Sequence, residues 1–315
     1  MLRVVLRSKD RSGSPVYDGD FPDPFVLVTG DRFFAYGTQT GDMNLQVMES
    51  ADLASWEHRG EALPELPSWA GRGHTWAPAV LQRGSRGSGG VPQEKVYVLY
   101  YTVRYEAAGR QAISVATASD PAGPFVDRSA EPMIFQEDHA GSIDPSPFVD
   151  GDGAAYLLWK GDDNAVDRPA SLWGAPLRPD GLALAGQPTE LLRYDCAWEE
   201  PLVEAPCLAR VGDGAYVLFY SGGWWESDTY AIGYATGPGP LGPFHNETED
   251  VPWLASEEGR AGPGGAEVFI DADGGWRLAF HAWTPPKVGY DQGGARSLWI
   301  ESIEFRDGRP VLRDG

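Results

Sequence analysis

Five stretches of the chain share one pattern of apolar and polar positions. Each begins with a small or acidic residue and an apolar run, and a turn of Gly and Asp then leads into a strand rich in aromatic and β-branched residues. A turn of this kind between two apolar runs is typical of a β-hairpin. The five stretches begin at Asp23, Ala77, Asp144, Ala205 and Ala266.

A second pair of short strands follows in most of these units. The segments "LQVMESADLASWEHRG", "ISVATASDPAGPFVD" and "IGYATGPGPLGPFHN" each contain a strand, a turn and an aromatic residue. Five units of about four strands, repeated at intervals of roughly 60 residues, predict an all-β five-bladed β-propeller with antiparallel blades. The alternative is a β-sandwich or two small β domains, but it does not explain the nearly constant spacing.

Composition and charge narrow the function classes. The chain has 315 residues, with 40 glycines, 26 prolines and a net charge of −21, and it shows no stripe of Lys and Arg. Nucleic acid and an anionic membrane surface are therefore not expected as partners. No apolar run approaches the length of a membrane span. The first 20 residues do not have the pattern of a signal peptide, so we expect a cytoplasmic protein, or a secreted one if a leader has been removed.

The chain has only two cysteines, Cys196 and Cys207. Two cysteines cannot form a disulfide framework, and the sequence allows them either to pair or to remain free thiols. No group of Cys and His residues has the spacing of a zinc site, so no metal ligands are assigned.

Carboxylates recur at matching places in the repeat. Asp23 and Asp144 occupy the first position of the unit in blades one and three, and Glu204 directly precedes Ala205 in blade four. The innermost strands of a propeller run side by side around its central channel, so their first residues gather at one end. Three carboxyl groups far apart in the sequence are therefore expected to face one pocket.

Such a cluster suits the hydrolysis of a glycosidic bond. Inversion requires one carboxylate that activates water and one carboxylic acid that protonates the departing oxygen. A third carboxylate beside the acid raises the pKa of its neighbour, which helps to keep the two groups in different protonation states. An Asp next to Pro is also ordinary turn chemistry, but three acids in register favour catalysis.

Four motifs occur in order along the chain: "FPDPFV", "WAPAV", "SIDPSPFVDGDGAAYL" and "VEAPCL". With these motifs the sequence resembles glycoside hydrolase family 43, whose five-bladed propellers act on arabinan, arabinoxylan and xylan. The resemblance implies one catalytic propeller domain over residues 1–315. It further implies Asp23 as the general base, Glu204 as the general acid, and Asp144 as the residue that orients the acid and tunes its pKa.

The resemblance also implies two residues that bind the sugar: Arg296 from the last blade and His281 near the channel axis. No cofactor is required, although a histidine of this kind stands beside a water or a calcium ion in the family, so a structural Ca²⁺ in the central channel is an alternative. Trp76, Trp224 and Trp225 are further candidate sugar contacts, because aromatic residues in loops often bind ligands.

Three other acids are assigned no catalytic role. Asp18 and Asp20 are interpreted as solvated acids of a loop, and Glu267 as a residue that fixes its blade.

The expected activity is an inverting hydrolase that releases terminal or side-chain L-arabinofuranosyl units from arabinose- or xylose-containing oligo- and polysaccharides. The stretches "SGGWWESDTYAIGYA" and "YDQGGARSLWIES" are most similar to the arabinofuranosidase branch. A β-xylosidase is the near alternative. A retaining fructan hydrolase lacks its expected motifs here, and a non-catalytic carbohydrate-binding propeller would not need the complete set of acids.

Overall fold

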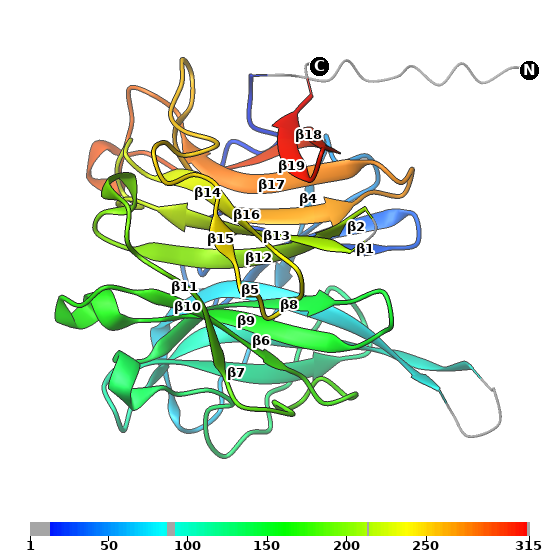
Figure 1. The fold of residues 1–315 in the computed structure, drawn as a ribbon. Coiled ribbons are helices and arrows are strands. Elements are labelled where there is room, and N and C mark those ends of the chain that lie inside the picture. Colours follow the sequence, from blue (N-terminus) through cyan, green and yellow to red (C-terminus); the bar gives the residue numbers. More distant parts are fainter. Residues whose placement is uncertain (1–12, 87–91, 213, 314–315) are drawn as a thin grey trace, which may run out of the picture.

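Five antiparallel sheets surround a narrow central channel in the computed structural model, which describes residues 13–86, 92–212 and 214–313 (Figure 1). Each sheet is formed by one continuous stretch of chain, and its strands follow one another in sequence order. The innermost strands β1, β5, β8, β12 and β16 contact each other in turn, and β16 contacts β1. The predicted five-bladed β-propeller is confirmed.

Each sheet is one blade, and the innermost strand of each comes first. Blade one contains β1 (Phe25–Thr29), β2 (Arg32–Gly37), β3 (Gln46–Ser50) and β4 (Glu57–Glu61). Blade two contains β5 (Ala70–Arg86), β6 (Pro92–Tyr105) and β7 (Arg110–Ala118). Blade three contains β8 (Ser142–Val149), β9 (Ala155–Gly161), β10 (Ser171–Pro176) and β11 (Thr189–Arg193). Blade four contains β12 (Val203–Val211), β13 (Ala215–Gly222), β14 (Ala231–Gly237) and β15 (His245–Asn246). Blade five contains β16 (Ala261–Ile270), β17 (Trp276–Trp283), β18 (Ser297–Arg306) and β19 (Arg309–Leu312).

The helices of the described residues are single turns of 3₁₀ helix in the connecting loops. They are η1 (Glu137–His139), η2 (Asp163–Val166), η3 (Ala197–Glu199) and η4 (Tyr290–Gln292).

Blade two departs from the expected number of about four strands. Its fourth segment is reduced to an isolated bridge, in which Thr117 and Val126 exchange two backbone hydrogen bonds. The segment that leads to this bridge contains Pro121 and Pro124. Proline has no backbone N–H to donate, so it does not extend a ladder of hydrogen bonds.

The apolar core is divided into five clusters, one between each pair of neighbouring blades. Alternate residues of an inner strand face opposite neighbours: Val80 packs toward blade one, and Leu81 packs toward blade three. This is the two-residue period of a strand that is buried on both faces. Cys196 and Cys207 are both buried and both free thiols.

The N-terminal segment closes the ring by adding to the last blade. Val16 and Tyr17 donate their N–H groups to the carbonyl of Leu298 in β18, and the Leu298 N–H returns a bond to Tyr17. Phe21 N–H donates to the carbonyl of Arg296. These bonds bring the start of blade one to the end of blade five.

One residue within each inner strand, or just before it in blade one, has a left-handed backbone, with φ between 43° and 64°: Asp23, Ala77, Asp144, Ala205 and Gly265. We call these five positions the left-handed positions. Four of them agree with the start of the repeat unit predicted from the sequence. In blade five the position is Gly265, one residue before the predicted Ala266.

Each left-handed position donates its N–H to a side chain of the preceding blade. In four blades the acceptor lies at the end of the second strand or directly after it: Ala77 to Thr38, Asp144 to Thr102, Gly265 to Ser221, and Asp23 to His281, at 2.8–3.0 Å. In blade four, Ala205 instead donates to the Asp144 carboxylate, at 3.0 Å. A repeated hydrogen bond thus links every blade to the next.

No helix in the described ranges is long and apolar enough to span a lipid bilayer. The expected cytoplasmic location and the expected absence of a nucleic-acid partner stay predictions.

Gly265 is the left-handed position that requires glycine for space as well as for backbone freedom. A Cβ there would lie 2.8 Å from His281 Nδ1, in a buried position where the imidazole cannot move aside. We expect Gly265→Ala to lower the free energy of unfolding by about 1–2 kcal/mol through backbone strain and by about 1–3 kcal/mol more through overpacking. Urea denaturation measures this loss.

Gly274→Ala is the matched control, because Gly274 also has a positive φ, of 83°, but a Cβ there meets no atom within 4 Å. Equal losses in the two variants would contradict the steric part of the prediction.

Candidate active site

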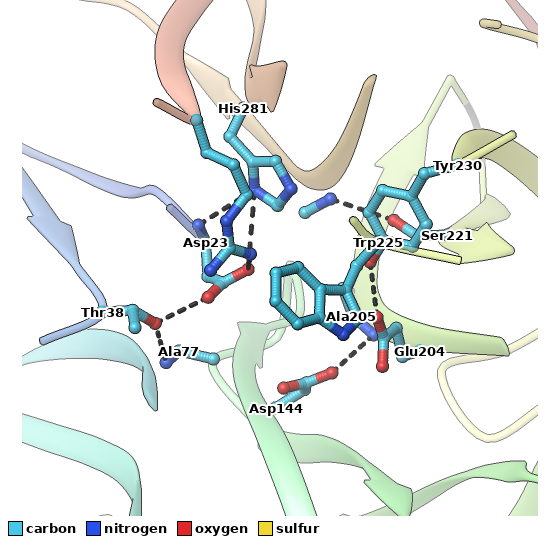
Figure 2. A network of polar contacts seen from close by, with 12 residues as sticks. Asp23, Thr38, Ala77, Asp144, Glu204, Ala205, Ser221, Trp225, Tyr230 and His281 are labelled. Carbon is cyan, nitrogen blue, oxygen red and sulfur yellow. Dashed lines mark hydrogen bonds and ion pairs between the residues drawn. The ribbon is translucent and has the colours of Figure 1, made fainter. Parts of the chain in front are cut away.

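A cavity of about 540 Å³ opens at the end of the propeller where the inner strands begin. Its walls include seven of the eight site residues predicted from the sequence: Asp23, Asp144, Glu204, Trp76, Trp224, Trp225 and Arg296. Asp23, Asp144 and Glu204 come from three blades, and their carboxyl groups point into one common space (Figure 2). The left-handed positions create this convergence, because two of the acids occupy such a position and the third directly precedes one.

The Asp23 carboxylate is held by two donors. The hydroxyl of Thr38 donates to Oδ2 at 2.6 Å, and the same hydroxyl accepts the N–H of Ala77 at 2.8 Å. Arg296 Nη1 donates to Oδ1 at 3.3 Å. These two contacts fix the position of the Asp23 carboxyl group.

Arg296 is a buried cation enclosed by aromatic rings. Its guanidinium lies 4.8 Å from the centroid of Trp225 and 5.6 Å from that of Tyr290. Burial alone would lower the pKa of Arg296, but Asp23, Tyr290 and Asp20 together outweigh it, and the net shift is upward. A permanent positive charge therefore lies beside the predicted base.

Asp20 belongs to the site, although the sequence analysis interpreted it as a solvated loop acid. It lines the cavity, accepts the backbone N–H of Arg296 at 2.9 Å and accepts the hydroxyl of Tyr290 at 3.2 Å. Burial raises the pKa of Asp20, and its contacts with Arg296 oppose that rise. Asp18, by contrast, is exposed as expected.

Glu204 accepts one hydrogen bond on each carboxyl oxygen. The hydroxyl of Tyr230 donates to Oε1 at 2.7 Å, and the ammonium of Lys160 donates to Oε2 at 3.0 Å. Glu204, Tyr230 and Lys160 are all buried or nearly so. The carboxyl group is therefore fixed from two sides while it still lines the cavity.

Asp144 is half-buried in the wall of the same cavity and interacts electrostatically with both other acids. Burial raises its pKa well above the usual value, and the negative charge of Glu204 raises it further. Lys160 opposes this rise, and Asp23 contributes a smaller upward effect. The Asp144 Oδ2 atom accepts the backbone N–H of Ala205, so this side chain is also fixed.

The structure places His281 behind Asp23 and not in the cavity wall, which differs from the sugar contact expected from the sequence. Its side chain is fully buried, and its Nδ1 accepts the Asp23 N–H at 3.0 Å. Its ring stacks on Tyr230, with an interplanar angle of 12°. Consecutive glycines, Gly264 and Gly265, leave the space for these two rings. His281 thus holds the backbone of Asp23.

The arrangement of His281 does not fit a calcium ligand. Burial, and then the charge of Arg296, lower the pKa of His281 well below its usual value, so the imidazole is neutral. Because Nδ1 accepts a hydrogen bond, the single ring hydrogen is on Nε2, which is buried and has no partner among the described residues. A nitrogen that carries a hydrogen has no lone pair for a metal ion.

Glu267 lines the narrow central channel and not the cavity, in agreement with the non-catalytic interpretation. Burial raises its pKa to about 8, and contact with the Cys207 thiol opposes that rise.

Aromatic side chains form much of the cavity mouth. Trp224 is 43% exposed, and its ring lies 5.7 Å from that of Trp225, which in turn lies 6.1 Å from Tyr290. Trp76, from blade two, also lines the cavity and is half-buried. Aromatic faces beside clustered carboxylates are suited to a neutral, hydroxyl-rich ligand such as a sugar.

A propeller with three convergent acids and aromatic walls defines a class, the carbohydrate-cleaving propeller enzymes. The sequence profile of the glycosyl hydrolases family 43 matches residues 12–310. The chain belongs to this family and is a glycoside hydrolase, as the resemblance of its motifs indicated.

Individual relatives agree with this assignment. The chain is 28% identical to a β-D-galactofuranosidase of Aspergillus niger over 79% of its own length and 70% of the relative. It is 25% identical to a xylosidase/arabinosidase of Butyrivibrio fibrisolvens over 96% of its length, but it spans only 57% of that relative. The crystal structure of a thermostable family-43 glycoside hydrolase superimposes with a TM-score of 0.80, at 26% identity, covering 94% of this chain and 93% of the other.

The sequence analysis missed Thr38, Lys160 and Tyr230, which bond to Asp23 or Glu204, and Tyr290, which bonds to Asp20 and Arg296. A signal was present for two of them. Near the end of the second strand of each blade, an aromatic residue is followed by a polar residue, either directly or after one glycine. Thr38 and Lys160 are two of these polar residues.

Thr38 offers a test of the hydrogen bonds that hold Asp23. Thr38→Val keeps the shape of the side chain but leaves the Ala77 N–H without its acceptor and Asp23 Oδ2 without its donor. We expect a loss of about 1–3 kcal/mol in the free energy of unfolding, measured by urea denaturation. Thr38→Ser keeps the hydroxyl and should lose clearly less. A larger loss in Thr38→Ser than in Thr38→Val would show that packing of the methyl group matters and that the hydroxyl does not.

Proposed function

We propose that this protein is an inverting α-L-arabinofuranosidase that releases terminal or side-chain L-arabinofuranosyl units from arabinan- or arabinoxylan-type saccharides. Asp23 is the general base, Glu204 is the general acid, and Asp144 orients Glu204 and tunes its protonation. The observation that carries the proposal is the presence of all three acids in one cavity, each with its own set of partners.

The proposed step is a single displacement. Asp23 takes a proton from a water molecule as its oxygen attacks the anomeric carbon. The bond from that carbon to the leaving oxygen breaks, and Glu204 gives its proton to that oxygen. Arg296 and the hydroxyl of Thr38 hold the Asp23 carboxyl group in place for the first transfer. Because the pKa of Asp144 is raised, the pair formed by Asp144 and Glu204 retains a proton for the second transfer.

The choice of sugar rests on the relatives. One is named a β-D-galactofuranosidase and another a xylosidase/arabinosidase, so a five-membered sugar ring and a pentose both occur among the named activities. Arabinofuranose combines these two features. A β-xylosidase is the second candidate, because xylosidase is part of the name of the second relative.

The substrate proposal predicts a clear preference between two chromogenic compounds. We expect the protein to hydrolyse an aryl α-L-arabinofuranoside with a kcat/KM at least about tenfold above that for the aryl β-D-xyloside, since a tenfold difference needs only about 1.4 kcal/mol of differential binding in the transition state. Proton NMR of the first product should show an inverted anomeric configuration.

The reverse preference would support the β-xylosidase. A retained configuration would contradict the single displacement, and sugar binding without turnover would contradict the enzyme proposal altogether.

The roles of the two acids predict different responses to the leaving group. Glu204→Gln should lower kcat/KM by about 10²–10⁴-fold for natural saccharides, whose leaving groups need a proton, and far less for activated aryl glycosides. Asp23→Asn should lower both by similar factors, because the water must be activated in either case. The reversed pattern would show that the base and the acid are exchanged.

A further inference from the structure

Lys160 interrupts a pattern that the other four blades keep. The residue before each left-handed position pairs with the end of the second strand of its own blade: Trp76 with Thr102, Ile143 with Lys160, Glu204 with Ser221, and Gly264 with His281. In blade one, Thr38 donates its N–H to the carbonyl of Pro22 and so occupies the same place. Thr38, Thr102, Ser221 and His281 all accept the N–H of the next blade's left-handed position.

Lysine cannot perform this structural task. An ammonium group has three donors and no acceptor. The Ala205 N–H, which would have bonded to this residue, donates instead to Asp144 Oδ2. A serine or threonine at position 160 would restore the pattern without placing a charge in the interior, so interblade bonding does not explain the lysine.

The surroundings of Lys160 show what its charge contacts. The side chain is 1% exposed, and its Nζ lies 3.0 Å from Glu204 Oε2 and 3.7 Å from Asp162 Oδ1. Burial favours the neutral amine, but the negative charges of Glu204, Asp162 and Asp144 outweigh it, so that the pKa of Lys160 is raised. A buried cation without such partners is strongly destabilising.

We propose that Lys160 is a positioning residue that makes Glu204 a stronger acid, by stabilising the carboxylate that forms as Glu204 gives its proton to the leaving oxygen. This inference rests on the proposed function, since it assigns Lys160 to the acid of that reaction. Before the proton is transferred, the ammonium of Lys160 stabilises the protonated Glu204 only weakly. As the proton leaves, a full negative charge forms 3.0 Å from the ammonium, inside a site where attraction between charges is strong.

Glu204 therefore lies between opposing charges. The negative charge of Asp144, from β8, opposes loss of the proton from Glu204. The positive charge of Lys160, at the end of β9, favours it. The Tyr230 hydroxyl, ahead of β14, contacts the other oxygen and is neutral, because burial and then the charge of Glu204 raise its pKa well above the usual value.

Two further charges act from a greater distance, Asp23 on Asp144 and Arg110 on Asp162. Asp162 itself carries negative charge near both Lys160 and Glu204, so it opposes the effect of the lysine.

The test is the pH dependence of kcat/KM on aryl glycosides with good and poor leaving groups, for the wild type, Lys160→Met and Asp162→Asn. Without the ammonium, the Asp144–Glu204 pair loses its proton at a higher pH, so the basic limb should move up by about 1–3 pH units in Lys160→Met. Poor leaving groups should lose at least about tenfold in kcat/KM, and good ones clearly less.

Asp162→Asn removes the opposing charge, so its basic limb should move the other way, to lower pH. If Lys160 had only a structural role, Lys160→Met would lower kcat/KM equally for good and poor leaving groups and would leave both limbs of the pH profile in place. This result overturns the inference. Circular dichroism shows whether each variant folds. If Lys160→Met does not fold, Lys160→Gln takes its place, because it keeps a hydrogen-bond donor without the charge; an unmoved basic limb in that variant overturns the inference.

The outcome also separates the inference from the function on which it rests. If the wild type is active but the limbs of the pH profile do not move in the folded variants, only the role of Lys160 is contradicted. A wild type that hydrolyses neither aryl arabinofuranosides nor aryl xylosides contradicts the proposed function, and the inference with it.

Discussion

The hydrogen bond from each left-handed position to the preceding blade is the constraint on which the site depends. The backbone at these positions is held in a conformation that non-glycine residues seldom adopt, and the N–H is bound to a buried or half-buried side chain. Because the bond recurs in every blade, the five left-handed positions lie together around the central channel. A carboxyl group at this position, or directly before it, is then aimed into the shared cavity.

This geometry lets structural and chemical roles meet in single residues. Thr38 binds blade two through the Ala77 N–H and at the same time donates to the Asp23 carboxylate. Asp144 accepts the Ala205 N–H while it faces Glu204 as a neighbouring acid. Such residues explain how blades formed from different stretches of the chain hold three acids, which are far apart in the sequence, in fixed positions relative to one another.

The sequence allowed the blades, their order and the three acids to be predicted, because each depends on a local signal that repeats. Alternation of apolar residues marks the strands, and an Asp-Pro or Glu-Ala-Pro step marks the entry to an inner strand. The errors arose where the signal was weak or where packing decided. Gly265 had no proline to mark it, Asp20 looked like a loop acid, and His281 was expected in the cavity but lies behind Asp23.

What the sequence determined by itself was therefore the repeat, the all-β architecture and the identity of the groups that reach the channel end, since all three follow from residue type and spacing within a blade. Only the tertiary structure decided which side chains surround each acid. Lys160 and Glu204 are 44 positions apart, and Arg296 and Asp23 are 273 apart, so nothing in their local sequence relates them. Their proximity comes from the closure of the ring, and so do the burial and the charges that set the protonation of the acids.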